Sequence, residues 1–243
     1  MTEMIPTLVV FDLDDTLYEF QPCDEAGRIG LAALVSSRFG EIGERFDDAF
    51  SRARLLVKGR LGETASSHSR LLYCHEALEL LGLRSEPRMA LEMEQAYWRS
   101  YLAVAELRPG ALDLIDTLRY NSVPIAIVTD LTTQIQFRKL VYLDIEQYFD
   151  HVVCSEETRN DKSSLEPFEL LASRVGAAAL ECVWFIGDRA TDAPIEELIE
   201  RGTIKSGLGF VSEHLTPGSQ HVRHWDRLSD IERQVTERFV TVV

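Results

Sequence analysis

The sequence predicts an open α/β sheet of parallel strands, interrupted by an inserted helical segment. Two observations support this prediction. Short apolar runs alternate with helical patterns at the start and in the second half of the chain, whereas residues 23–106 show helical spacing only. Strands that alternate with helices are typical of parallel βαβ units. A length of 243 residues suits one large domain or two modest ones.

Five short apolar runs are the predicted strands. They are continuous in hydrophobicity, which is typical of strands buried on both faces of a parallel sheet. These strands cover residues 7–11, 123–128, 152–154, 182–186 and 207–211. Apolar residues at helical spacing predict helices between them, over residues 111–120, 132–143, 166–175 and 193–201.

The inserted segment contains no convincing strand. Four sets of apolar residues at helical spacing begin at Ile29, Phe46, Leu71 and Met89. Prolines and a glycine that break regular structure lie near residues 20–22 and 107–110. We therefore expect a core domain of residues 1–20 and 107–243, and an inserted helical domain of residues 21–106.

The charge balance restricts the partners. Forty acidic and 25 basic side chains give a formal net charge of −15. Nucleic acids and anionic membranes are bound by clustered Lys and Arg, so we expect neither as a partner. A small anionic substrate stays compatible, because a metal ion or one buried Lys can reverse the local field.

Cysteine usage and the N-terminal residues favour a cytoplasmic protein. The four cysteines lie far apart and form no CxxC pair, a pattern that suits reduced thiols. The first residues lack the basic region of a secretory signal. The longest apolar stretches fall short of the roughly 18 residues that span a bilayer. No feature of the sequence sets an oligomeric state.

Polar side chains with a common chemistry follow four of the predicted strands. In open α/β sheets ligands bind beyond the carboxyl ends of the strands, so these side chains are expected at one edge. Crowded carboxylates raise one another's pKa and favour a divalent cation. Carboxylates, a hard cation and a Lys together suit phosphoryl transfer. The residues are Asp12, Asp14, Asp15, Thr16, Thr129, Asp130, Arg159, Lys162, Asp188 and Asp192.

Four motifs together resemble the haloacid dehalogenase superfamily, and within it the phosphatase branch. They are DLDDT at residues 12–16, Thr129 in VTD, Lys162, and GDRATD at residues 187–192. Their order matches that of the family over nearly the whole chain. The resemblance implies a Rossmann-like core with a helical cap inserted after the first motif. It also implies Mg²⁺ as cofactor and a small phosphorylated metabolite as substrate, of the sugar phosphate or nucleoside monophosphate class.

The resemblance assigns catalytic roles to the first motif. Asp12 is the implied nucleophile, which attacks phosphorus and forms an aspartyl-phosphate. Asp14 is the implied general acid for the leaving alcohol and then the general base for water. That role calls for a pKa raised from about 3.9 toward neutrality.

The other motifs supply the implied ligands of the substrate and the metal. Thr129 hydrogen-bonds a phosphoryl oxygen, Lys162 neutralises its charge, and Asp130 is counted among the substrate-binding residues. The metal ligands are Asp12, Asp14 through its backbone carbonyl, and Asp188, while Asp192 supports the metal shell or Lys162.

The sequence departs from the family pattern in two places. Asp130 stands where Asn is frequent, which adds a negative charge near the site. Lys162 is followed by Ser163 and Ser164, where the family usually has Pro-x-Pro. Arg159 is the alternative for the Lys162 position.

Three other functions remain open at this point. A phosphomutase uses the same aspartyl-phosphate and hands the phosphoryl group to a sugar. A 2-haloacid dehalogenase of the same superfamily needs neither the second Asp nor a metal, so Asp14 and Asp188 argue against it. A non-enzymatic, phospho-accepting receiver module also combines Asp, Thr and Lys, but it needs only about half this length.

Overall fold

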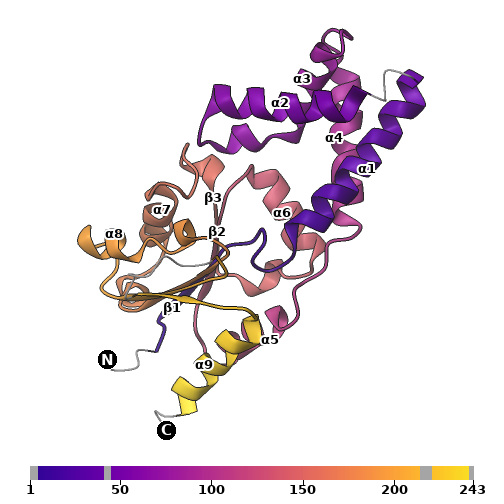
Figure 1. Ribbon diagram of the computed structural model, residues 1–243. Helices are drawn as coiled ribbons and strands as arrows, with labels where there is room; N and C mark the ends of the chain where they lie inside the picture. The colour runs from indigo at the N-terminus through magenta and orange to yellow at the C-terminus, as the bar shows by residue number, and fades with distance from the viewer. Residues whose placement is uncertain (1–4, 41–44, 214–220, 241–243) are drawn as a thin grey trace. The chain divides into compact units, whose positions relative to one another are not determined.

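The computed structural model describes residues 5–40, 45–213 and 221–240 and divides into two compact units. The core unit comprises Met1–Glu19 and Glu106–Val243, and the insert unit comprises Phe20–Ala105. In Figure 1 the core unit carries the sheet, whereas the described residues of the insert unit form helices only.

The core unit is built on one parallel sheet of six strands. The strands are β1 (Leu8–Phe11), β2 (Ile125–Thr129), β3 (His151–Cys154), β4 (Val183–Gly187), β5 (Gly207–Val211) and β6 (Val222–His224). Their order across the sheet is β3-β2-β1-β4-β5-β6. Every pair of neighbours is parallel. The predicted α/β, Rossmann-like core is therefore confirmed.

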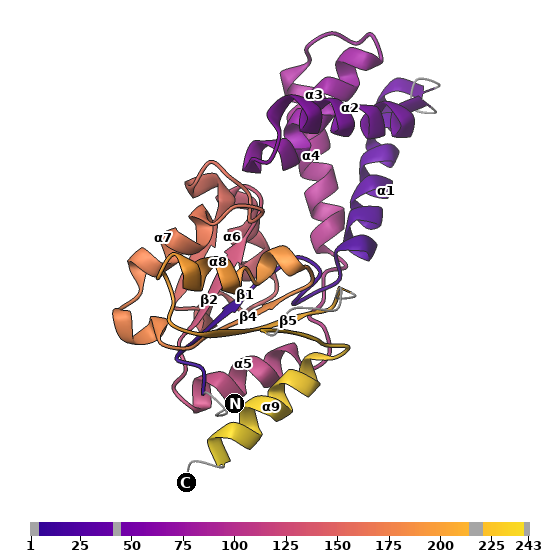
Figure 2. The same cartoon turned by 60° about the vertical axis from the view of Figure 1, so that its left-hand side comes forward.

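Helices cover both faces of this sheet, which explains why its central strands are continuously apolar. All residues of β1, β2 and β4 are buried. Helices α7 (Glu166–Arg174) and α8 (Ile195–Glu200) pack on the face that carries Val10 and Phe185. Helices α5 (Ala111–Tyr120) and α9 (Leu228–Val240) pack against each other, as Figure 2 shows below the sheet.

The register brings the ends of the inner strands to one edge. Phe11 at the end of β1 lies opposite Ile127 of β2 and Ile186 of β4. Thr129 at the end of β2 lies opposite Cys154 of β3. The loops that leave β1, β2, β3 and β4 therefore start side by side. The loop after β2, for example, leads into α6 (Thr133–Tyr142).

Two elements of the core unit were not predicted. Strand β6 has only three residues, all of them half-buried or exposed, so it has no apolar run. Helix α9 buries Leu228, Ile231 and Val235, and this spacing of three and four residues is an ordinary helical pattern. The sequence did not predict β6 because an edge strand has no apolar run. Helix α9 could have been predicted from its apolar spacing.

The described residues of the insert unit form four α-helices and a short 3₁₀ segment. They are α1 (Phe20–Phe39), α2 (Phe46–Leu61), η2 (Ala65–His68), α3 (Arg70–Leu80) and α4 (Pro87–Leu102). Helices α1 and α4 approach closely because Gly27 has no side chain: a Cβ there would lie 2.7 Å from the Tyr97 ring. Pro22 does not interrupt α1, since it lies in the first turn, where no intrahelical N–H is needed. Ile29, expected on the buried face, is 65% exposed, and Leu31 is buried instead.

A buried arginine organises the middle of the insert unit. Arg70 is only 9% exposed and its Nη2 lies 3.5 Å from Asp24 Oδ1. Its guanidinium lies 5.3–5.8 Å from the centres of four aromatic rings, a favourable cation–π arrangement. The rings are Phe20, Tyr73, Tyr97 and Trp98. Arg70 therefore serves packing.

All four cysteines, Cys23, Cys74, Cys154 and Cys182, are buried, and they form no disulfide with one another. Across residues 5–40, 45–213 and 221–240, no helix joins enough length with enough apolar character to cross a bilayer.

The sheet core is expected to dominate the stability of the core unit. Phe185 is 2% exposed and packs edge-on against Phe168, with ring centres 5.9 Å apart. We expect Phe185→Ala to lower the free energy of unfolding by about 3–5 kcal/mol, because it leaves a cavity in a dry core. Urea denaturation measures this value. The control Tyr120→Ala, at a side chain that is 90% exposed, should change it by less than about 0.5 kcal/mol.

Candidate active site

The site begins where β1 ends. The backbone N–H of Asp12 donates to the Ile186 carbonyl at 2.8 Å, and this bond fixes Asp12 at the carboxyl edge of the sheet. The chain then turns through Asp15, whose φ of 63° is a left-handed conformation. Thr16 returns over the strand end, and its hydroxyl donates to Asp12 Oδ2 at 3.1 Å.

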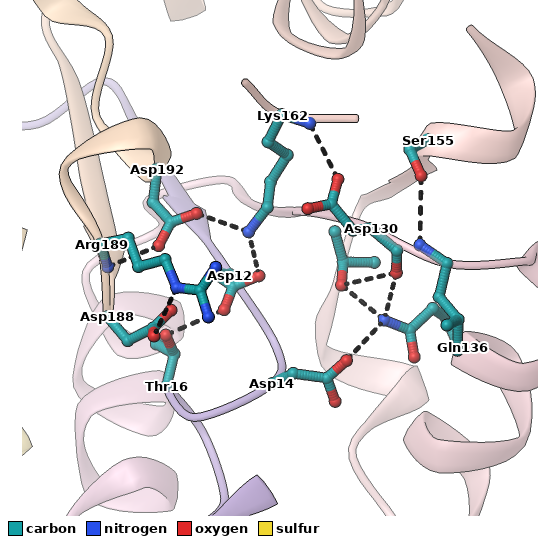
Figure 3. A network of polar contacts seen from close by, with 12 residues as sticks. Asp12, Asp14, Thr16, Asp130, Gln136, Ser155, Lys162, Asp188, Arg189 and Asp192 are labelled. Atoms are coloured by element: carbon teal, nitrogen blue, oxygen red, sulfur yellow. Dashed lines mark hydrogen bonds and ion pairs between the residues drawn. The ribbon is translucent and has the colours of Figure 1, made fainter. Parts of the chain in front are cut away.

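A buried lysine joins two of the predicted carboxylates (Figure 3). Lys162 Nζ donates to Asp12 Oδ1 and, at 2.5 Å, to Asp192 Oδ1. All three residues are at most 7% exposed. Burial alone would lower the pKa of Lys162, but the charges of Asp12 and Asp192 raise it well above its usual value. The two carboxylates therefore favour the charged form of Lys162 beside Asp12. Arg159, the alternative, is exposed.

The glycine of the fourth motif makes room for Asp192. A Cβ on Gly187 would lie 2.2 Å from Asp192 Cβ and 2.4 Å from its Oδ2, which no side chain tolerates. Asp192 folds back over this bare strand end, and its Oδ2 accepts a hydrogen bond from the Arg189 backbone N–H at 2.9 Å. The Gly-Asp-x-x-x-Asp spacing thus places one carboxylate beside Lys162.

Three carboxylates converge near Lys162 in a geometry that fits a cation. Oxygens of Asp12, Asp188 and Asp192 all lie within 4.8 Å of one another. Burial and the charge of Asp192 raise the pKa of Asp188 to about 7. Burial, followed by the charges of Asp192, Asp188 and Asp14, raises the pKa of Asp12 against the opposing charge of Lys162. Hard carboxylate oxygens that repel one another are suitable ligands for Mg²⁺.

Asp14 points away from this cluster. Its carboxylate accepts two hydrogen bonds from Lys139 Nζ, at 2.6 and 2.8 Å, and one from Gln136 Nε2 at 3.2 Å. The Tyr18 hydroxyl donates to it as well. Burial raises the pKa of Asp14, but the charge of Lys139 and these hydrogen bonds outweigh that effect, so the pKa lies below its usual value. The expected raised pKa of Asp14 is therefore wrong for this arrangement.

The second motif, Thr129 and Asp130, is hydrogen-bonded both to Gln136 beside Asp14 and to the loop of Lys162. Thr129 Oγ1 accepts a hydrogen bond from Gln136 Nε2 at 2.6 Å. The Asp130 carbonyl accepts from the same Nε2 at 2.7 Å. Asp130 Oδ1 accepts from the backbone N–H of Lys162 at 2.8 Å. In this arrangement the Asp130 carboxylate fixes the loop that carries Lys162.

Two residues of this network, Gln136 and Lys139, were not predicted. Both lie on α6 and are fully or almost fully buried. They share the buried face of that helix with Ile135 and Leu140. The signal available in the sequence was that these polar residues occupy helix positions on the apolar face, one turn after the motif that ends β2. The cluster of Asp12, Asp188, Asp192 and Lys162 is brought together, whereas the Asp14 side chain turns toward α6.

The carboxylate cluster predicts that Mg²⁺ stabilises the protein in a pH-dependent way. The folded-state pKa of Asp188 is raised from 3.8 to about 7. Its contribution to stability is present below the lower value and is lost as the pH rises through the higher one. Above about pH 7 the free carboxylates repel, and a bound cation relieves that repulsion.

We therefore expect Mg²⁺ to raise Tm clearly at about pH 8 and little at about pH 5.5, measured by calorimetry. In Asp188→Asn the Mg²⁺ effect should largely disappear. An equal rise in Tm at both pH values would show that the ion binds elsewhere.

Comparisons with known proteins identify the family of this chain. A haloacid dehalogenase-like hydrolase family model matches residues 6–195. The chain is 40% identical over 187 residues to a ribulose-1,5-bisphosphate 5-phosphatase of Halopiger xanaduensis, which covers 75% of this chain and 76% of the relative. It is 26% identical to a glyceraldehyde 3-phosphate phosphatase of Methanocaldococcus jannaschii over 97% of this chain and 96% of the relative.

A solved structure extends the likeness to the fold of nearly the whole chain. It is a putative HAD-hydrolase, YfnB, of Bacillus subtilis bound to magnesium. The TM-score is 0.65 at 18% identity, covering 96% of this chain and 100% of that chain. The family model spans most of the chain, and both similar proteins are phosphatases by name. This chain belongs to the haloacid dehalogenase-like hydrolase family and is an enzyme of its phosphatase branch.

Proposed function

We propose that this protein is a magnesium-dependent phosphatase of small sugar phosphates that works through an aspartyl-phosphate on Asp12. The observation that carries the proposal is the contact of Lys162 Nζ with both Asp12 and Asp192, beside the group of three carboxylates. The two relatives are named for sugar phosphates, which favours that class over nucleoside monophosphates.

In the first step, a carboxylate oxygen of Asp12 forms a bond to phosphorus while the bond from phosphorus to the sugar oxygen breaks. Lys139 keeps Asp14 ionised in the free site, so in this proposal Asp14 first takes up a proton from solvent and then gives it to the leaving oxygen. Water then attacks the acyl phosphate, gives its proton back to Asp14, and releases inorganic phosphate with free Asp12. Lys162 neutralises charge on Asp12 and the phosphoryl oxygens, and the Thr129 hydroxyl binds one of those oxygens.

Mg²⁺ would be held by Asp12, Asp188 and the backbone carbonyl of Asp14, with Asp192 in support. When bound, it supplies positive charge that offsets the phosphoryl oxygens and the crowded carboxylates. The chemistry of the donor set supports this assignment, because the three carboxylates have one buried ammonium among them, and the Arg189 guanidinium that lies 3.4 Å from Asp188 is largely exposed.

The insert unit is proposed as the cap that selects the sugar. It interrupts the chain directly after the first motif, between Glu19 and Glu106. A domain inserted there can exclude bulk water from Asp12 and restrict entry to small substrates.

Phosphate release across a substrate panel tests the function. The panel contains ribulose 1,5-bisphosphate, glyceraldehyde 3-phosphate, phosphoglycolate, a nucleoside monophosphate and 2-chloropropionate, each with Mg²⁺ and with EDTA. Release of inorganic phosphate from a sugar phosphate with Mg²⁺ only is expected. Isomerised sugar phosphate without free phosphate would indicate a phosphomutase, halide release a dehalogenase, and a lasting acyl phosphate a receiver module.

Substitution of the two first-motif carboxylates separates their roles. We expect Asp12→Asn to lower kcat more than about 1,000-fold, because no acyl phosphate forms. We expect Asp14→Asn to lower kcat about 10²–10⁴-fold, the usual contribution of a general acid–base. Asp116→Asn, at an exposed position of α5, is the matched control and should be neutral. Normal turnover in Asp12→Asn would rule out the covalent route.

Asp130 is expected to act through the Lys162 loop. Asp130→Asn keeps an oxygen that can accept the Lys162 N–H, so kcat should fall less than about 5-fold. Asp130→Ala removes that acceptor and leaves a buried donor unpaired, so kcat should fall at least about 10-fold. Steady-state kinetics measure both values. Equal losses in the two variants would contradict a role for this hydrogen bond.

A further inference from the structure

We propose that Lys139 and Gln136 of α6 are positioning residues that hold Asp14 and connect it to Thr129. Their effect on catalysis is then exerted on protonation of the leaving oxygen. This inference rests on the proposed function, in which Asp14 is the proton donor.

Lys139 contacts both carboxylate oxygens of Asp14, and its ammonium is shielded from water. Lys139 Nζ lies 2.6 and 2.8 Å from the two carboxylate oxygens, and the lysine is only 2% exposed. The aromatic ring of Tyr18 covers the ammonium, with its centre 5.8 Å from Nζ, while the Tyr18 hydroxyl contacts Asp14. One buried cation therefore fixes both oxygens of the carboxylate at once (Figure 3 shows Asp14 beside Gln136).

Stability alone does not explain this pair. Removing the Lys139 ammonium from water is expensive, and the Asp14 side chain, 29% exposed, still loses most of its water. Such an ion pair commonly stabilises a fold no more than apolar residues of similar volume. An apolar residue at 139 would continue the buried face that Ile135 and Leu140 form on α6. We therefore infer that Lys139 is present because it orients the Asp14 carboxylate.

Gln136 lets Asp14 move without leaving a donor unpaired. Its Nε2 carries two hydrogens but faces three acceptors: Thr129 Oγ1 at 2.6 Å, the Asp130 carbonyl at 2.7 Å and Asp14 Oδ2 at 3.2 Å. The two nearer acceptors can use both hydrogens, so the longest contact, to Asp14, is the one that can be given up. The Oε1 of the same amide is buried without a hydrogen-bond partner.

Lys139 is then the tether that remains. Its flexible side chain can follow the carboxylate as Asp14 turns to a leaving oxygen. Gln136 meanwhile holds the phosphate-binding hydroxyl of Thr129 at a fixed place beside Asp14. Loss of the tether should leave the attack by Asp12 intact and impair only the proton transfer.

The test compares two esters whose leaving groups differ. The leaving alkoxide of glyceraldehyde 3-phosphate needs a proton, whereas para-nitrophenolate departs without one. We expect Lys139→Met to lower kcat about 10²-fold or more on glyceraldehyde 3-phosphate and less than about 10-fold on para-nitrophenyl phosphate. Gln136→Met should show the same preference with smaller losses. Equal losses on both esters would overturn the inference.

Two further variants separate positioning from folding. Leu140→Ala removes a buried apolar side chain of the same helix, so it should lower Tm without changing the ratio of the two kcat values. In the Asp14→Asn background, which has no charge to hold, Lys139→Met should change kcat less than about 3-fold. This double variant leaves no unpaired buried charge, so it tests the inference even where Lys139→Met alone does not fold. A further large loss in it would also overturn the inference.

The outcome for the proposed function is distinguishable. Wild-type protein that releases no phosphate from either ester overturns that function and this inference together. Active wild-type protein with equal losses in Lys139→Met overturns the inference alone.

Discussion

The buried ammonium of Lys162 is the contact on which the rest of the site depends. It lies at the carboxyl edge of the sheet, between Asp12 and Asp192, where little water can screen charges. Three carboxylates in such a place would repel one another strongly without a cation. The lysine offsets one of these charges and the exposed Arg189, 3.4 Å from Asp188, offsets part of another. The remaining negative charge is what makes the edge suitable for a divalent ion.

Much of the surrounding backbone can be understood as serving this contact. Gly187 lacks a side chain so that Asp192 can fold over the end of β4. Asp130 fixes the loop of Lys162 through the backbone N–H. Parallel register brings the ends of β1, β2 and β4 to the same edge. Each of these features uses a residue from a different part of the chain, so the site exists only in the folded protein.

The sequence was sufficient for the sheet because its central strands are apolar on both faces. Strand β5 and helix α5 have the predicted bounds. Strand β2 begins two residues and β4 one residue later than predicted, and both end one residue later, at Thr129 and Gly187. Strand β6 could not be predicted, since an exposed three-residue edge strand carries no hydrophobic pattern. Which face of α1 is buried was also beyond the pattern, because packing there uses Gly27 against Tyr97.

For the site, motif spacing identified the residues at the strand ends but not their partners. Asp12, Lys162, Asp188 and Asp192 follow strands and so could be expected to meet. Gln136 and Lys139 lie inside a helix, where a polar side chain ordinarily faces solvent. They are buried because they lie on the face of α6 that also buries Ile135 and Leu140, and their partner Asp14 comes from a distant part of the chain.

The opposite environments of Asp12 and Asp14 give a physical reason for their separate roles. The two residues are neighbours in the chain, yet the pKa of Asp12 is raised and that of Asp14 is lowered. Loss of water raises the pKa of both carboxylates, so it cannot account for the opposite directions. The neighbouring charges differ. Asp12 shares the Lys162 ammonium with Asp192 and faces Asp188, whereas both carboxylate oxygens of Asp14 accept hydrogen bonds from Lys139. A carboxylate crowded by like charges gains from binding a cation or a phosphoryl group, and a singly paired carboxylate gains from neither. The first is therefore suited to covalent attack. The second becomes a proton donor only when a substrate draws it from its lysine and it takes up a proton from solvent, which couples acid catalysis to occupation of the site.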